Sequence, residues 1–182
     1  LGWYTDNNFT TQVNDETIFT NSTTLYAKWN SEGYSIIYYL NNGTAGSNAP
    51  TSANIDEIID ISNPTKSVTI NFDENDTGAT ISDTTMTVSP TFLGWSADGL
   101  DTASAMYGTS SSAVTNSWTN GNSVVSAQYF KNLAISGGGV TLTASWQTAT
   151  ITLPTVTKTG YTCTWGSYSS GGSYTVAADS AS

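Results

Sequence analysis

Two tryptophan-bearing marks recur along this chain in the same order, and their recurrence constrains the fold more than any single residue does. The first copy runs from Gly2-Trp3-Tyr4 to a Thr-Leu-Tyr-Ala-Lys-Trp segment at 24–29. The second runs from Gly94-Trp95-Ser96 to a Thr-Leu-Thr-Ala-Ser-Trp segment at 141–146, with a longer stretch between the marks. Repetition on the scale of a domain indicates an array of similar units built around the same side chains.

A third, partial copy lies near the C-terminal end. The Asn-Pro-Thr-Lys segment at 63–66 is echoed by Leu-Pro-Thr-Val-Thr-Lys at 153–158, and Gly-Tyr-Thr-Cys-Thr-Trp at 160–165 supplies another tryptophan turn. The sequence therefore predicts three parts, which are the C-terminal half of a repeat at 1–30, a complete repeat enlarged by insertions at 31–146, and the N-terminal part of a further repeat at 147–182.

Half units have unpaired strand edges and an open apolar face. Two explanations are open at this point. The chain is a piece of a longer array, or its two halves complement each other, within one chain or head to tail between chains.

Strands are favoured over helices along most of the chain, because Thr, Val, Ile and Tyr are abundant. The run 34–40 is apolar on most of both faces, so we expect a central strand there, and Val68, Ile70 and Phe72 begin a second, alternating hairpin that continues at 80–88. The segment 55–61 fits a short helix or a strand, and 14–17 fits a helical turn or a hydrated turn. We expect a mainly β fold, α+β at most.

Composition excludes several classes of partner. The chain of 182 residues carries four lysines, no arginine and fourteen acids, for a net charge of -10. Nucleic-acid binding needs a basic surface, and an anionic membrane would repel this one. The longest apolar runs fall well short of the roughly 18 residues of a membrane span, so we expect no membrane insertion. The N-terminal residues lack a signal-peptide pattern, so export would be directed by a segment outside this chain.

Catalysis finds little support in the sequence. Histidine is absent, and Cys163 is the only cysteine, so neither a Cys-His pair nor a multi-cysteine metal site can form. Asp98 with Asp101, or Asp56 with Glu57, could supply paired carboxylates, but nothing marks either pair as facing across a cleft. The acidic segment 73–78 begins like a calcium loop, yet a threonine occupies the twelfth position, which favours a hydrated turn. We expect no enzyme, no cofactor and no metal.

The tryptophans fall into two groups. Five recur at equivalent stations, where a shared buried anchor explains them best, namely Trp3, Trp29, Trp95, Trp146 and Trp165. The other group lies in the long excursion at 100–139, outside the repeated pattern. There Tyr107 and Trp118 are the candidate ligand-binding residues, because an exposed aromatic face can stack on a sugar. Packing in the core is the alternative for both residues, and the sequence favours it.

Four segments of the chain resemble the Listeria-Bacteroides repeat, also called the internalin B-repeat. They are Gly-Trp-Tyr-Thr-Asp at 2–6, Thr-Leu-Tyr-Ala-Lys-Trp at 24–29, Asn-Pro-Thr-Lys at 63–66 and Lys-Thr-Gly-Tyr-Thr at 158–162. The resemblance covers 1–29 most strongly, and 34–66, 92–98, 141–146 and 147–176 less so, whereas 67–91 and 99–140 depart from it. It implies small β-grasp, ubiquitin-like units in tandem, on secreted or wall-anchored bacterial proteins, acting as spacers or interaction modules.

Together these observations predict a non-catalytic repeat segment of an exported bacterial surface protein, extracellular and located at the cell surface or cell wall. It would act as a stalk, a spacer or an adhesion module. Its expected partners are neighbouring repeats of the same protein and a host or bacterial surface protein or glycan. The alternative is a carbohydrate-binding module that uses Tyr107 and Trp118.

Overall fold

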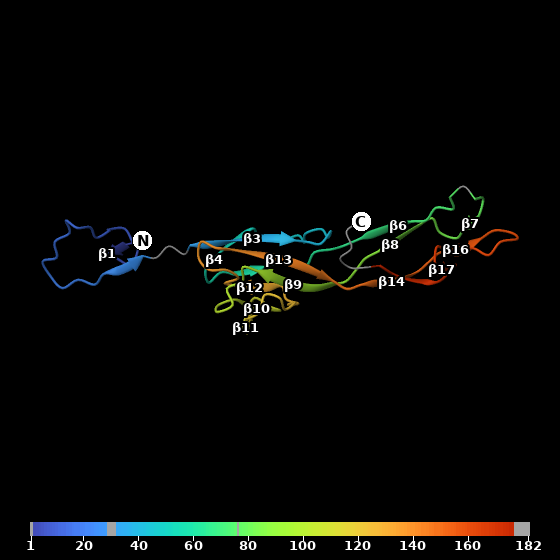
Figure 1. Ribbon diagram of the computed structural model, residues 1–182. Helices are drawn as coiled ribbons and strands as arrows, with labels where there is room; N and C mark the ends of the chain where they lie inside the picture. The colour runs from blue at the N-terminus through green and yellow to red at the C-terminus, as the bar shows by residue number, and fades with distance from the viewer. Residues whose placement is uncertain (1, 29–31, 76, 177–182) are drawn as a thin grey trace.

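The structure is a computed structural model that describes residues 2–28, 32–75 and 77–176. Within these ranges the chain forms strands and turns and no helix, which confirms a mainly β fold. The segment 14–17 is a turn closed by the Thr17 amide donating to the Asn14 carbonyl at 3.0 Å. The strands gather in three bodies that follow one another in Figure 1, here called the N-terminal unit, the central unit and the C-terminal body.

The N-terminal unit is a ribbon of two antiparallel strands, β1 (Gly2–Tyr4) and β2 (Tyr26–Lys28). The far side of β1 is flanked by the segment 11–13, through a 2.8 Å hydrogen bond from the Val13 amide to the Trp3 carbonyl. No residue of 2–28 is buried. A ribbon of this size without a core is marginally stable at best in water.

The central unit contains a mixed sheet with the strand order β4-β3-β13-β9. Its strands are β3 (Gly33–Tyr39), β4 (Ser52–Asn54), β9 (Phe92–Asp98) and β13 (Gly139–Trp146). The middle pair, β3 and β13, is parallel, while β4 and β9 are antiparallel to their neighbours. A parallel pair needs a long crossover, and the connection between β3 and β13 holds the rest of the central unit.

A second, antiparallel sheet with the order β11-β10-β12-β5 covers one face of the mixed sheet. Its strands are β5 (Ile58–Asp60), β10 (Met106–Gly108), β11 (Asn116–Ser117) and β12 (Tyr129–Lys131). The segment 55–61 is thus a strand rather than a helix. Side chains from both sheets form one core, with Trp95, Trp118, Phe130, Leu133 and Leu142 among its most buried members.

The strand β3 lies between β4 and β13, as its sequence predicts, but only one of its faces is buried. Tyr34 and Ile36 point into the core, whereas Ile37 is 60% and Tyr39 62% exposed. The second sheet covers the inner face alone, so the apolar side chains on the other face of this central strand are exposed.

The C-terminal body combines two distant parts of the chain. The first is the predicted hairpin of β6 (Val68–Asn71) and β8 (Thr85–Val88), with β7 (Thr80–Ile81) at its tip. The second supplies β14 (Ala149–Thr152), β15 (Val156–Thr157), β16 (Thr164–Trp165), β17 (Tyr168–Ser169) and β18 (Ser173–Val176). Strand β14 pairs antiparallel with β18, and β15 pairs with β7.

This arrangement differs from the expected boundary between 31–146 and 147–182, because the hairpin at 68–88 packs with the C-terminal part. Ile151, Leu153 and Val176 form a second core, and the half-buried side chains of Val68, Ile70, Phe72, Met86, Val88 and Trp165 pack against it. One face of the hairpin is apolar and needs a cover, which the strands after 147 provide.

The two complete tryptophan marks have the same strand register. Trp3 of β1 lies opposite Ala27 of β2, and Trp95 of β9 lies opposite Ala144 of β13. The glycine before each tryptophan has a positive φ, 154° at Gly2 and 143° at Gly94, a backbone conformation that favours glycine. The sequence repeat is therefore also a repeat of backbone pairing.

The equivalence extends to the strand on the other side of each tryptophan. The Val13 amide donates to the Trp3 carbonyl, and the Val125 amide donates to the Trp95 carbonyl, both at 2.8 Å. The N-terminal unit thus matches one half of the central unit, namely 121–125, β9 and β13.

The same comparison locates the main insertion of the central unit. In the N-terminal unit the Thr5 amide donates to Thr11 at 3.0 Å, and in the central unit the Ala97 amide donates to Gly121 at 2.7 Å. A short loop at 7–10 is therefore replaced by residues 99–120, which include β10 and β11 of the second sheet. The insertion supplies part of the layer that covers the core.

Candidate functional site

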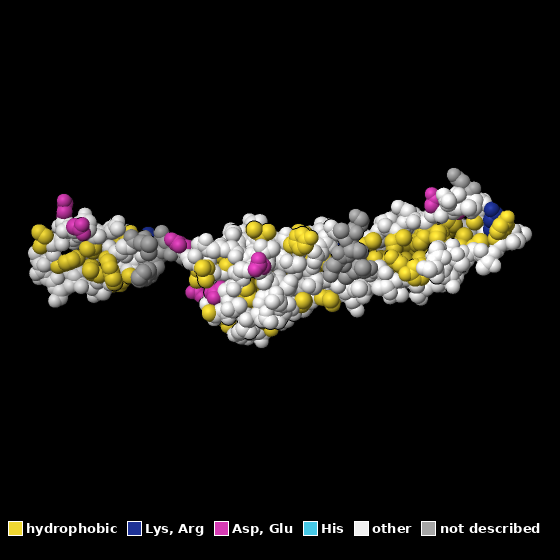
Figure 2. Space-filling view, viewed as in Figure 1, with side chains coloured by type: hydrophobic (Ala, Val, Ile, Leu, Met, Phe, Trp, Pro, Cys, Tyr) yellow, Lys and Arg dark blue, Asp and Glu magenta, His cyan; other side chains and the backbone are white. Residues whose placement is uncertain are grey.

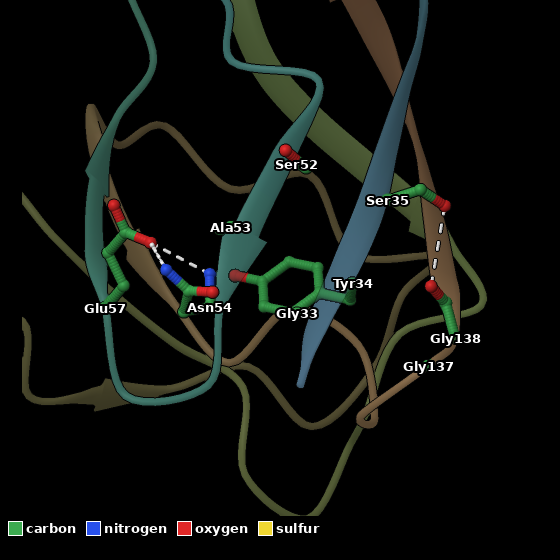
Figure 3. Close-up of a pocket in the computed structure, with 9 residues that line it drawn as sticks. All are labelled: Gly33, Tyr34, Ser35, Ser52, Ala53, Asn54, Glu57, Gly137 and Gly138. Carbon is green, nitrogen blue, oxygen red and sulfur yellow. Dashed lines mark hydrogen bonds between the residues drawn. The ribbon is translucent and has the colours of Figure 1, made fainter. Parts of the chain in front are cut away.

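A cleft of about 590 Å³ lies at the end of the central sheet where β3 begins (Figure 3). It is formed by the first residues of β3, the strand β4 with the turn after it, and the glycine turn that precedes β13. The lining residues are Gly33, Tyr34, Ser35, Ser52, Ala53, Asn54, Glu57, Gly137 and Gly138.

The polar groups of the cleft are partly engaged with one another. The Glu57 carboxylate accepts hydrogen bonds from the Asn54 backbone amide at 2.8 Å and from its side-chain amide at 3.1 Å (Figure 3). On the opposite wall the Ser35 hydroxyl donates to the Gly138 carbonyl at 3.4 Å. These contacts hold the two walls in shape.

The lining limits what the cleft can do chemically. Glu57 is the only acid among the lining residues, whereas glycoside hydrolysis of the usual kind needs two carboxylates. The phenol of Tyr34 is buried beneath the cleft, and burial raises its pKa, because the ionised form would lose its hydration. Hydroxyl, amide and carboxylate groups can form hydrogen bonds with a small polar ligand.

The structure places the two candidate ligand-binding aromatics away from this cleft. Trp118 is 2% exposed, and its ring packs between Phe130, at 6.0 Å between centroids, and Tyr107, at 6.5 Å. Its indole N–H donates to the Asn120 carbonyl at 2.9 Å. Tyr107 is half-buried on β10. The insertion is part of the second sheet, so its tryptophan fills the core and offers no open face to a sugar.

The recurring tryptophans divide by burial. Trp95 and Trp146 are buried anchors, as the repeat predicts, and Trp165 is half-buried in the C-terminal body. Trp29 lies outside the described residues. Trp3 is 54% exposed, which corrects the expectation that it is buried, because the N-terminal unit has no covering layer over β1 and β2.

In the acidic segment, the described residues 73–75 and 77–78 form hydrogen bonds with one another through the carboxylates of Asp73 and Glu74. The Glu74 carboxylate accepts from the Gly78 amide at 2.6 Å and from the Thr77 hydroxyl at 3.1 Å, and Asp73 accepts from the Asn75 amide at 2.8 Å. In the described part of the chain, His, Cys, Asp and Glu side chains do not gather in a group of three that could hold a metal ion.

Two other carboxylates have lowered pKa values. The Lys131 ammonium, 3.0 Å from Asp56, together with the Asn132 amide, lowers the pKa of Asp56. Backbone amides of Thr10 and Thr11 lower the pKa of Asp6. Both carboxylates organise loops, and neither lines the cleft.

Comparison with known proteins gives no match to a family model, to a curated protein or to a solved structure. Across the described ranges, no helix is long and apolar enough to cross a membrane.

Proposed function

We propose that this chain is a non-catalytic repeat segment of an exported bacterial cell-surface protein, acting outside the cell as a stalk, spacer or adhesion module. The observation that carries the proposal is the shared register of Trp3 with Ala27 and of Trp95 with Ala144. Units repeated at the level of backbone pairing are typical of arrays that extend or display rather than catalyse.

The finer assignment of the fold, a β-grasp-like repeat, is part of this proposal. It is supported by the strand order β4-β3-β13-β9, in which the first and last strands of the unit are parallel neighbours at the centre of the sheet. The central unit would then be an enlarged member, in which a second sheet provides the cover of the inner face.

The surface chemistry is compatible with a spacer. A net charge of -10 with only four lysines makes neighbouring molecules repel at long range, and keeps such an array soluble. Neighbouring repeats are its first partners in this account. For an adhesion role, the cleft of Figure 3 is the better contact for a polar ligand, because Trp118 is buried. We therefore do not propose the carbohydrate-binding alternative based on Tyr107 and Trp118.

Surface display is tested on the cells that make the protein. Antibodies raised against this chain are expected to label intact cells, and brief treatment of those cells with an external protease is expected to remove the label. A cytoplasmic protein, left intact by the same treatment, serves as the control. Labelling that requires permeabilised cells would contradict the proposal.

A further inference from the structure

Two asparagine-glycine pairs lie at turns of the central unit, at 42–43 and 120–121, and both asparagine side chains are exposed. Such pairs have a chemistry of their own. Because glycine has no side chain to shield its backbone nitrogen, that nitrogen can attack the side-chain carbonyl of the asparagine before it. The two pairs of this chain differ in how their peptide groups are hydrogen-bonded.

The first pair is held in an unreactive arrangement. The Gly43 amide donates to the Leu40 carbonyl at 2.9 Å, and Asn41 and Asn42 have positive φ values of 48° and 61°, as in a tight hairpin turn. A hydrogen bond from an N–H group to a carbonyl stabilises the protonated form of the nitrogen. The Gly43 nitrogen is therefore a poor nucleophile.

The peptide group between Asn120 and Gly121 has the opposite arrangement. Its carbonyl oxygen accepts from the buried indole N–H of Trp118 at 2.9 Å and from the Ser123 amide at 3.0 Å. Its N–H donates no hydrogen bond within the described residues. When a peptide nitrogen loses its proton, the negative charge spreads to the carbonyl oxygen, where donors stabilise it. The two contacts therefore make the Gly121 nitrogen easier to deprotonate.

The carbonyl that this nitrogen would attack is also held in place. The Asn120 side-chain oxygen accepts from the Asn122 backbone amide at 3.0 Å. This local turn keeps the side-chain carbonyl carbon beside the backbone that follows it, where the Gly121 nitrogen lies. The same hydrogen bond stabilises the negative charge that the oxygen acquires during the attack.

The fold itself requires glycine at this position. The Gly121 carbonyl accepts from the Ala97 amide at 2.7 Å, and a Cβ added to Gly121 would lie 2.2 Å from the Ala97 carbonyl oxygen. A side chain would therefore clash with β9 at the point where the insertion returns to it. The packing of the turn against β9 thus places an unshielded nitrogen after Asn120.

We infer that Asn120 is a self-modifying site, at which the fold promotes loss of the side-chain amide. The Gly121 nitrogen gives its proton to hydroxide and bonds to the Asn120 side-chain carbonyl carbon, while the side-chain nitrogen takes up a proton from water and leaves as ammonia. Water then opens the cyclic imide at either carbonyl, which gives aspartate or isoaspartate. The net reaction consumes water, releases ammonia and transfers no electrons.

The product differs from asparagine in charge and in backbone length. Either product adds a carboxylate to the central unit, whose surface is mostly neutral and polar on the face that Figure 2 shows. Isoaspartate also lengthens the main chain between the Trp118 contact and the pairing of Gly121 with β9. The reaction needs only water, so the inference does not rest on the proposed function.

The test compares the two pairs within one chain during storage in neutral buffer. Cleavage after lysine places Asn42 on the peptide 29–66 and Asn120 on the peptide 67–131, and tandem mass spectrometry follows the replacement of the amide by a carboxyl group at each site. In the folded chain Asn120 is expected to react at least about 10-fold faster than Asn42, because only its peptide group is activated. The same chain unfolded in urea is the control, in which the two rates are expected to be similar.

A second comparison tests the part played by the indole. Trp118→Phe keeps an aromatic ring in the core but removes the N–H donor, and is expected to slow the reaction at Asn120 by about 10-fold. Trp95→Phe is the matched control, because Trp95 is also buried but its indole N–H has no hydrogen-bond partner, and it is expected to leave that rate unchanged. Both variants are stored below their thermal transitions. Equal rates at the two asparagines of the folded chain, or a rate in Trp118→Phe that is no lower than in the unaltered chain, would overturn the proposal.

Discussion

Trp95 is fixed in the core by aromatic neighbours on the same sheet. The ring of Phe92 lies 5.1 Å and that of Tyr38 5.6 Å from its own centroid, both edge-on, a favourable geometry for aromatic pairs. The glycine before it is equally constrained, because a Cβ added to Gly94 would lie 2.4 Å from the Val125 carbonyl oxygen. Trp3 has the same backbone pairing, but its side chain is 54% exposed, so it contributes less to stability than Trp95 does.

This difference gives a prediction for single substitutions. Trp95→Ala is expected to destabilise the central unit by about 3–5 kcal/mol, because it leaves a large cavity in a packed core. Trp3→Ala is the matched control, and its effect on the central unit is expected to stay within about 0.5 kcal/mol. Urea denaturation of dilute, monomeric protein, followed by far-UV circular dichroism, measures both. Equal losses in the two variants would be incompatible with the burial described.

The repeat allowed the anchor role of Trp95 and Trp146 to be predicted from the sequence. The role of Trp118 could not be predicted in this way, because it lies in an insertion that has no second copy within the chain. Its burial is decided by tertiary packing against Phe130. The cleft was also beyond prediction, because it is built mostly from glycine, serine and backbone, and these residues carry no pattern of their own.

At the scale of elements, the hairpin β6–β8 is the part of the chain whose position changes the interpretation most. Its alternation of apolar and polar residues predicted two paired strands, and the pairing of Val68 with Val88 and of Ile70 with Met86 confirms them. The alternation of apolar and polar residues indicates that one face of the hairpin must be buried, but it does not indicate which segment of the chain buries it. The cover comes from residues after 147, so the hairpin belongs to the C-terminal body.

Excision of the hairpin tests this assignment. Val68 and Val88 lie directly opposite each other, so their Cα atoms are roughly 5 Å apart and a Gly-Gly link can replace residues 69–87. We expect the central unit to keep its thermal transition, followed by the near-UV signal of its buried tryptophans, while the transition of the C-terminal body is lost. A similar excision of residues 40–50, within the central unit, is the control and is expected to lower the central transition. Loss of that transition on removal of the hairpin would show that the hairpin belongs to the central core instead.

Within the described residues, one well-covered unit lies between two parts that each have a strand edge without a partner strand. The core of the central unit is closed by its second sheet, whereas the N-terminal unit has no buried residue among 2–28. Sequence repetition predicted that 2–28 matches part of the central unit, and the shared strand register agrees with this. It did not predict that the hairpin β6–β8 packs with the strands after 147, because a repeat pattern is local and this packing joins segments far apart in the chain.

The central claim, that successive units share one strand register, is tested most directly by proton NMR of the intact chain. Because the carbonyl of each tryptophan points to the flanking strand at Val13 or Val125, Trp3 with Ala27 and Trp95 with Ala144 are non-hydrogen-bonded pairs. Such pairs bring their Cα atoms to about 4.5 Å and their Hα atoms into contact. The account predicts an Hα–Hα cross-peak for each of the two pairs. A cross-peak from Trp3 to a different residue of β2, with Trp95 still opposite Ala144, would contradict it.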